Sequence, residues 1–388
     1  MNIGWYFSDD LSPSDELVDK FVDSKFGIDR WSSFAREIIQ NSLDAQDDES
    51  KPVEVIFDLN KELSISDIPG CNRTKEILEK CMKAATNKQT KGSYKVGLDV
   101  LDKEKIYCLK ISDKNTKGVK TGREEAWGAF VFDEGKSIKQ RPGSAGSYGV
   151  GKKVPFIISS CNTVFYATKN KYSVGDDEYS DCLLQGKTTL ISWTDNDGKR
   201  KNSKGWYGVI DESADPKNRV NPIVASNDND INPYFIRKDD YGTDVIIVGV
   251  NIYDNEADVT ASIISAVLEN FFVAILNENL VVKVLDEVIN KASFEKMFRK
   301  YYRTQSETKN GLEGCLRVYQ GEADESHKIY DKNANCLGRI DIYFGLGNEH
   351  NKKYYTIVRS HGMRITDYRL NKAGQPYTAV VYIDELLQ

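Results

Sequence analysis

The ten residues REIIQNSLDA, numbers 36 to 45, constrain the fold more than any other stretch of the chain. If they form a helix, the isoleucines and the leucine supply an apolar stripe that must be buried. Glu37, Asn41 and Asp44 then recur at i, i+4 and i+7, which is the spacing of one helix face. The stretch therefore predicts a helix that is buried on one side and presents three polar groups in one direction.

The composition predicts an ordinary globular protein with two domains. The chain has 388 residues, of which 40% are hydrophobic and 29% charged. Its formal net charge of -6 gives no overall attraction to nucleic acid or to an anionic membrane. Seven cysteines without a C-x-x-C pair indicate reduced thiols rather than disulfides or a zinc site. We recognise neither a secretion signal nor an apolar run of membrane-spanning length, and therefore expect a cytoplasmic protein without a membrane segment.

Sequence patterns divide the chain near residue 250. The first part alternates between predicted strands at 52–59, 105–113, 162–169, 188–193 and 243–250 and predicted helices at 12–26, 32–46 and 74–85. An apolar helix at 261–276 then introduces a helix at 294–302 and strands at 280–286, 339–346 and 355–360. We expect an α/β domain over 1–250 and a smaller α+β domain over 251–388, with the boundary between Gly249 and Glu256. The ending VVYIDELLQ hints at a fragment of a longer protein.

Three features of the first part suggest a site. Glu37 could activate water as a general base, and the amide oxygen of Asn41, one turn later, could help to hold Mg²⁺ over a triphosphate. Asp113 ends a predicted strand and could accept hydrogen bonds from an exocyclic amine. Each feature has a simpler interpretation. A lone E-x-x-x-N pair is more often a solvated helix face, and an isolated aspartate after a strand more often opens a turn.

The third feature is the glycine-rich stretch GSAGSYGVGKK, residues 143 to 153. Its glycines permit close backbone approach to an anion, and Lys152 adds positive charge beside a predicted helix start. The alternative, a flexible surface loop, is less favoured because an apolar helix follows. Gly146, Gly151 and Lys152 also spell most of a Walker A loop, but Lys153 stands where a Ser or Thr should bind Mg²⁺. We therefore reject a P-loop, which would also leave Glu37 without a role.

Taken in order, these motifs resemble the GHKL ATPases, a superfamily that includes DNA gyrase B, the heat-shock chaperone ATPase, histidine kinases, MutL and MORC proteins. The resemblance rests on E-x-x-x-N-S-x-D-A, the strand ending in Asp113, the glycine-rich stretch and Gly242-Thr243 at the start of a strand, and it covers about residues 30 to 250. GSYGVGKKVPF is similar to the corresponding stretch of MORC-like bacterial ATPases that are associated with anti-phage defence. The resemblance implies a Bergerat-type α/β sandwich, a mixed sheet with helices on one face and an N-terminal strap, followed by a transducer-like α+β domain.

The resemblance also implies roles for individual residues. Glu37 would be the base that activates water, Asn41 would coordinate Mg²⁺, and Asp44 would shape the phosphate side of an ATP site. Asp113 would bind the adenine amino group, directly and through a water that Thr243 supports. A lid would close over the β- and γ-phosphates, built from Gly146, Ser147, Tyr148, Gly149, Val150, Gly151 and Lys152.

The chain departs from the family pattern beside Asp113. The usual D-x-G-x-G is here D-K-N-T-K-G, so that Asn115 stands at the first glycine position and Gly118 lies one residue late. Asparagine tolerates a left-handed backbone better than most residues, so the substitution is physically plausible. MutL-like relatives also use a lysine of the second domain at the γ-phosphate. Lys353, Arg359 and Arg364 are candidates here, although a solvated strand edge is the favoured role for each.

The implied activity is ATP hydrolysis that drives lid closure and ATP-dependent homodimerisation, in a protein that works with an effector partner. A histidine kinase is not expected, because none of the three histidines lies on a dimerisation helix. Basic stretches at 198–206 and 294–303 could contact DNA, but the net charge does not favour it. In the second stretch, Phe294, Met297, Phe298 and Tyr301 have the spacing of a core face. The alternative to an ATPase is a nucleotide-binding or scaffold protein without turnover.

Overall fold

A computed structural model describes residues 2–10, 30–120, 127–128, 131, 153–171, 182–216, 218–225, 230–238, 240–250, 252, 255–302, 312–321, 340–346, 353–369 and 376–383. The helix predicted over 12–26 and the lid from Gly146 to Lys152 lie outside these residues. Contacts group the described residues into two units. The first unit takes those of Met1–Phe34, Val55–Ile138 and Gly146–Glu256, and the second takes those of Ala35–Glu54 and Ala257–Gln388.

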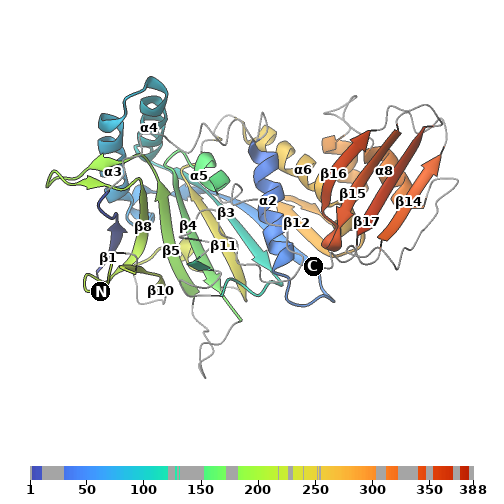
Figure 1. Cartoon of the computed structure of the whole chain (residues 1–388), viewed down its shortest axis with the longest axis horizontal. Coiled ribbons are helices and arrows are strands. Elements are labelled where there is room, and N and C mark those ends of the chain that lie inside the picture. The colour runs from blue at the N-terminus through green and yellow to red at the C-terminus, as the bar shows by residue number, and fades with distance from the viewer. Residues whose placement is uncertain are drawn as a thin grey trace. The chain divides into compact units, whose positions relative to one another are not determined.

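The first unit is built on one large sheet (Figure 1). Its strands follow the order β1 (Ile3–Tyr6), β8 (Lys204–Ile210), β5 (Cys182–Thr189), β4 (Thr163–Lys169), β11 (Gly242–Val248), β3 (Ile106–Lys114) and β2 (Val53–Leu63). From β1 to β3, each strand runs antiparallel to the next. Smaller strands add to it or form a separate hairpin: β9 (Val220–Asn221) on β8, β10 (Ile223–Ala225) on β5, and β6 (Trp193–Thr194) with β7 (Arg200–Lys201).

The central strands are buried on both faces. All residues of β5 and β11, and all but the last of β4, are buried. Side chains alternate along a strand, and Ile246 and Val248 of β11 join the core cluster that contains α3 (Cys71–Ala84) and α4 (Lys88–Leu101). Val245 and Ile247 therefore point to the opposite face. Asp113 and Thr243 share that parity, so they lie on the face away from α3 and α4.

Helix α4 was not predicted from the sequence. It begins where the Asn87 side chain accepts a hydrogen bond from the backbone N–H of Thr90, at 2.7 Å. Two glycines, Gly92 and Gly97, weaken its helix propensity and obscure its pattern. Tyr94 nevertheless anchors the helix, because its side chain is buried and its hydroxyl accepts the Ile191 N–H at 2.9 Å. The short helix α5 (Val154–Ile158) contacts β4 and β11.

The second unit contains a four-stranded sheet of order β14 (Ile340–Leu346), β17 (Tyr377–Ile383), β15 (Lys353–Arg359) and β16 (Arg364–Arg369). β15 and β17 are parallel and the outer pairs antiparallel, so this sheet is mixed. Helix α8 (Leu312–Tyr319) packs across β17 and β14 (Figure 1). The unit also holds α2 (Arg30–Asp44) from Ala35 onward, and the hairpin of β12 (Leu280–Val284) with β13 (Glu287–Ile289).

Helix α6 (Glu256–Leu276) corrects the expectation of a chain without a membrane-spanning run. Among the described residues it is the one helix long and apolar enough to cross a membrane, judged by length and composition alone. However, 67% of its most apolar window is buried, which is what the core helix of a globular unit shows. Phe271 leaves helical geometry at φ -128° and ψ 17°, so α6 consists of two segments joined at a kink.

The aromatic stretch at 294–302 forms part of the core. It folds as α7 (Phe294–Met297) and continues into a π-helical turn over Phe298–Tyr302. Phe294, Met297 and Phe298 are buried, as their spacing predicts. The prediction is wrong for Tyr301, which is only partly buried, because the π-helical turn buries Tyr302 instead. The expected fold class is therefore confirmed as an α/β unit with a large sheet, together with a smaller α+β unit. The boundary near residue 250 stays a prediction, since contacts also assign residues 35–54 to the second unit.

The two glycines of α4 offer a matched test of this packing. A Cβ on Gly97 would overlap the Ser160 carbonyl oxygen, whereas a Cβ on Gly92 would meet nothing within 4 Å. We expect Gly97→Ala to lower the free energy of unfolding by about 1–3 kcal/mol through overpacking. Gly92→Ala should raise it by roughly 0.5–1 kcal/mol through helix propensity. Urea unfolding followed by circular dichroism measures both, and equal effects of the two substitutions would contradict the packing of α4 on Ser160.

Candidate functional site

The end of β3 and the start of β11 meet at Asp113. The antiparallel register pairs Asp244 with Ser112, which places Thr243 beside Asp113. The Thr243 backbone N–H donates to Asp113 Oδ1 at 2.7 Å, and the Thr116 hydroxyl donates to the same oxygen at 2.7 Å. The Thr243 hydroxyl lies 3.3 Å from that of Thr168. The structure thus brings together two residues that the sequence singled out from positions 130 apart.

Burial sets the electrostatics of Asp113. The residue is only 8% exposed, and burial raises the pKa of its carboxyl group above the ordinary value of 3.8. The charge of Arg237 and the hydrogen bonds from Thr243 and Thr116 act in the opposite direction, whereas the charge of Asp244 raises the pKa further. An ionised carboxylate accepts hydrogen bonds and cannot donate them, so it suits an exocyclic amine.

Two residues of the loop after Asp113 have a left-handed backbone conformation. Asn115 has φ 57° and Gly118 has φ 66°, both in the left-handed region. A Cβ on Gly118 would overlap the Lys169 carbonyl oxygen, and the Lys171 N–H donates to the Lys117 carbonyl at 3.1 Å. The loop is therefore held against the end of β4, and only a residue without Cβ fits at Gly118.

Arg237 is a residue of this site that sequence reasoning missed. It is 3% exposed, and its guanidinium donates from Nη1 to Asp244 Oδ1 at 2.5 Å and from Nη2 to the Asp113 carbonyl oxygen at 2.6 Å. Further bonds reach the carbonyl oxygens of Tyr241 and Asp240, at 3.1 and 2.9 Å. The sole sequence signal is an arginine five residues before Gly-Thr. These partners offset the cost of burying the charge.

Gly242 makes this arrangement sterically feasible. Its φ is +146°, in a region that side-chain-bearing residues rarely adopt. A Cβ there would overlap Arg237 Nη2 and would lie 2.6 Å from Asp113 Oδ1. The glycine of the Gly-Thr pair therefore leaves room for the guanidinium between the two strands.

Helix α2 carries the other predicted polar residues, in the second unit. Glu37 and Asp44 are half-buried and Asn41 is exposed, and the helix geometry places all three on one face. Asp44 Oδ1 accepts a hydrogen bond from Arg359 Nη2 at 2.8 Å, in an ion pair whose arginine side chain is 4% exposed. Asp44 is thus tied to the end of β15.

Two arginines that were predicted to lie at a solvated strand edge are buried. Arg359 is buried on Asp44, and Arg364 pairs with Glu269 at 2.8 Å and with Asp367 at 3.2 Å. A solvated role is therefore wrong for both, because each guanidinium finds a carboxylate inside the second unit. The side chain of Lys353 lies outside the described residues.

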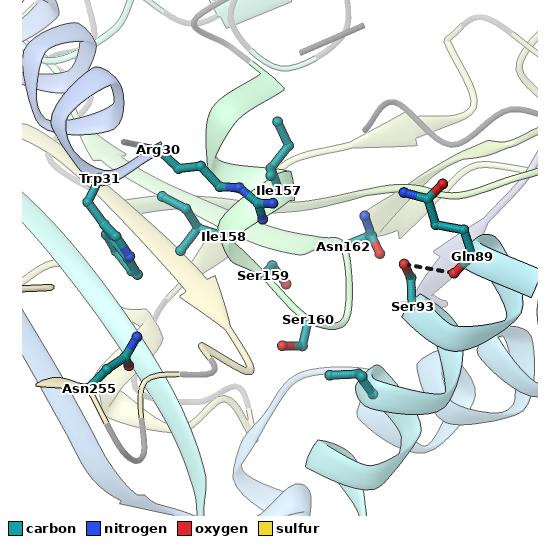
Figure 2. Close-up of a pocket in the computed structure, with 11 residues that line it drawn as sticks. Arg30, Trp31, Gln89, Ser93, Ile157, Ile158, Ser159, Ser160, Asn162 and Asn255 are labelled. Atoms are coloured by element: carbon teal, nitrogen blue, oxygen red, sulfur yellow. Dashed lines mark hydrogen bonds between the residues drawn. The ribbon is translucent and has the colours of Figure 1, made fainter. Parts of the chain in front are cut away.

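A cavity of about 410 Å³ in the first unit is separate from these residues (Figure 2). It lies between the starts of α2 and α4 and the end of α5, and its lining includes Arg30, Trp31, Gln89 and Ser159. None of the predicted site residues that the structure describes lines it. The Ser159 hydroxyl donates to the Val248 carbonyl at 2.6 Å, and the Asn162 amide donates to the Phe156 carbonyl at 3.4 Å. These two polar groups therefore serve the fold itself.

Asp113→Asn should show the cost of the buried carboxyl group. Between pH 3.8 and the raised pKa the folded state binds more protons than the unfolded state, so this group lowers stability as pH rises. An amide oxygen can accept the same bonds from Thr243 and Thr116. We expect Asp113→Asn to gain stability relative to the unsubstituted protein between pH 4 and pH 7 in urea unfolding. Asp58→Asn, on an exposed position of β2, is the control. A relative loss for Asp113→Asn would show that Arg237 outweighs burial.

Comparisons with known proteins give likenesses in structure alone. No protein-family model and no curated protein matches the chain. The ATPase region of Saccharomyces cerevisiae topoisomerase II, bound to dexrazoxane, matches with a TM-score of 0.38 and 9% identity over 91% of this chain and 73% of that one. The Aquifex aeolicus MutL ATPase domain matches with a TM-score of 0.30 and 9% identity over 90% and 87%. Likenesses of this size do not establish a family or an activity for the chain.

Proposed function

We propose that this protein is a Mg²⁺-dependent ATPase of the GHKL type, in which ATP binding and hydrolysis drive lid closure and dimerisation. The observation that carries the proposal is the buried carboxylate of Asp113, held at the junction of β3 and β11 by Thr243 and Thr116. A buried acceptor at a strand end, beside a loop with two left-handed residues, suits the amino group of adenine.

Helix α2 would serve the phosphate end of the substrate. Glu37 would accept a proton from the attacking water as a general base. Asn41 has an exposed amide on the same helix face, and its oxygen is of the hard type that Mg²⁺ takes in addition to phosphate oxygens and waters. Bound there, Mg²⁺ would neutralise charge on the phosphates. Asp44 would fix the orientation of this face through its ion pair with Arg359.

Arg359 is the best supported of the three cations proposed for the second domain. Its guanidinium is buried and lies on the polar face of α2 through Asp44, in the same unit as Glu37. A cation held at this place could sense the terminal phosphate, the role that a lysine has in MutL-like proteins. Arg364 pairs with two carboxylates, those of Glu269 and Asp367, whereas Arg359 pairs with one.

The biological setting is proposed from the resemblance alone. A lid from Gly146 to Lys152 would close over the phosphates, N-terminal segments would join two protomers, and the second unit would pass the state to an effector in a bacterial cytoplasm. The similarity of GSYGVGKKVPF to MORC-like bacterial ATPases favours an anti-phage defence system. DNA remains the less favoured partner, since Lys201 pairs with Asp9 and Lys300 with Glu287. Basic residues in both candidate stretches are thus partly neutralised.

Glu37→Ala tests the assigned base. We expect Mg-ATP turnover to fall by about 100-fold or more, the usual worth of a positioned general base, while ATP binding persists. Phosphate release measures turnover and calorimetry measures binding. Glu79→Ala removes an exposed glutamate from α3 and should leave both unchanged. ATP binding without turnover in the unsubstituted protein would favour the scaffold alternative, and absence of binding would reject the nucleotide site.

Dimerisation is tested by mass in solution. Light scattering after size-exclusion chromatography should show one protomer mass without nucleotide and twice that mass with a non-hydrolysable ATP analogue and Mg²⁺. Glu37→Ala should remain dimeric in ATP, because hydrolysis no longer resets the lid. An unchanged mass under saturating analogue would contradict ATP-driven dimerisation and leave ATP hydrolysis to be judged separately.

A further inference from the structure

The guanidinium of Arg237 holds Asp113 through its main chain. Nη2 donates to the Asp113 carbonyl oxygen at 2.6 Å, while the Asp113 carboxylate receives the Thr243 N–H at 2.7 Å. The backbone and the side chain of one residue are therefore fixed from two sides. Gly242 lies between these bonds, where any side chain would overlap the guanidinium. The direction of the Asp113 carboxylate thus depends on Arg237.

The same guanidinium also binds a second buried acid, Asp244. Asp113 and Asp244 are 8% and 3% exposed and lie on neighbouring strands. Arg237 Nη1 binds Asp244 at 2.5 Å, and Lys110 Nζ lies 3.8 Å from the other Asp244 oxygen. Without this cation, burial and the charge of Asp244 would both raise the pKa of Asp113 and favour its protonated form. A protonated Asp113 would become a donor, which is the wrong partner for an amine.

We propose that Arg237 is a positioning residue that selects a 6-amino purine over a 6-oxo purine, by fixing Asp113 and keeping it a hydrogen-bond acceptor. This inference rests on the proposed function, in which Asp113 recognises the base. Arg237 acts through Asp113 and is not assigned a contact with the nucleotide. An acceptor-only group binds the amino group of ATP and repels the 6-oxo group of ITP, so its orientation and its charge both enter the selectivity.

The geometry requires an arginine rather than any cation. Three guanidinium nitrogens reach four acceptors: Asp244 Oδ1 and the carbonyl oxygens of Asp113, Tyr241 and Asp240. A lysine ammonium keeps the charge but cannot reproduce this planar fork. Arg237→Lys therefore separates positioning from charge. Asp244→Asn complements it, because it retains an acceptor for the fork and removes the counter-charge.

The experiment compares ATP with ITP on the full chain. Dissociation constants and steady-state kinetics are measured for the unsubstituted protein, Arg237→Lys, Asp244→Asn and the control Arg299→Gln, an exposed arginine of the second unit. We expect Arg237→Lys to reduce the preference for ATP by about tenfold or more, the range of one hydrogen bond to a charged group. KM for ATP should rise while kcat at saturation changes little. Arg299→Gln should keep the original preference.

Equal losses for ATP and ITP in Arg237→Lys, or an unchanged ratio, would overturn the inference, since a merely structural arginine would weaken both alike. If Arg237→Lys does not fold, Asp244→Asn decides. It keeps an acceptor for the fork and removes a charge that raises the pKa of Asp113, so an unchanged or raised ATP-to-ITP ratio supports the inference and a lowered ratio overturns it. Asp113→Asn distinguishes a failure of the inference about Arg237 from a failure of the proposed function. If Asp113→Asn loses the ATP preference and Arg237→Lys keeps it, the inference alone fails. If the unsubstituted protein does not prefer ATP, the proposed base recognition fails as well.

Discussion

The buried pair of Arg237 and Asp244 is the constraint around which the centre of the first unit is arranged. A guanidinium in the interior costs several kcal/mol unless its hydrogen bonds are satisfied, so its surroundings must supply acceptors. They do so with one carboxylate and three main-chain carbonyl groups. One of those carbonyls belongs to Asp113, and the space for the guanidinium exists because residue 242 is glycine. The contacts of Arg237 that satisfy the core therefore also hold Asp113, the residue proposed to bind the adenine base.

The three polar residues on one face of α2 differ in how they are held. Asn41 is exposed and Glu37 half-buried, while Asp44 is tied to the buried Arg359. A carboxylate so engaged is less available to a ligand and better suited to fix the helix. The three polar residues of one helix face thus divide into two that remain accessible and one that anchors the face to β15.

Periodicity predicted the elements that carry the candidate site, and short-range patterns could go no further. Helix α2 and strands β3 and β11 were recognisable because their apolar residues recur at regular spacings. The left-handed backbone at Asn115 agrees with the sequence, because asparagine tolerates this conformation better than most residues. Arg237 could not be found in this way, because its partner Asp113 lies 124 residues away. Arg359 was misjudged for the same reason: only the tertiary fold reveals that a strand-end arginine is buried on a helix. Helix α4 was not predicted because its two glycines weaken the helical sequence pattern, and packing stabilises the helix in the fold.

The discontinuity of the second unit has a consequence for biosynthesis. Residues 35–54 group with the C-terminal part of the chain, and Arg359 follows its partner Asp44 by 315 residues. At about 5–20 residues per second, a ribosome needs roughly 15–60 s to deliver the arginine after the aspartate. During that interval, the part of α2 that belongs to the second unit waits without its C-terminal partners. Nascent chains of this protein should therefore depend on holdase chaperones at the ribosome more than a protein of similar size whose domains are sequential.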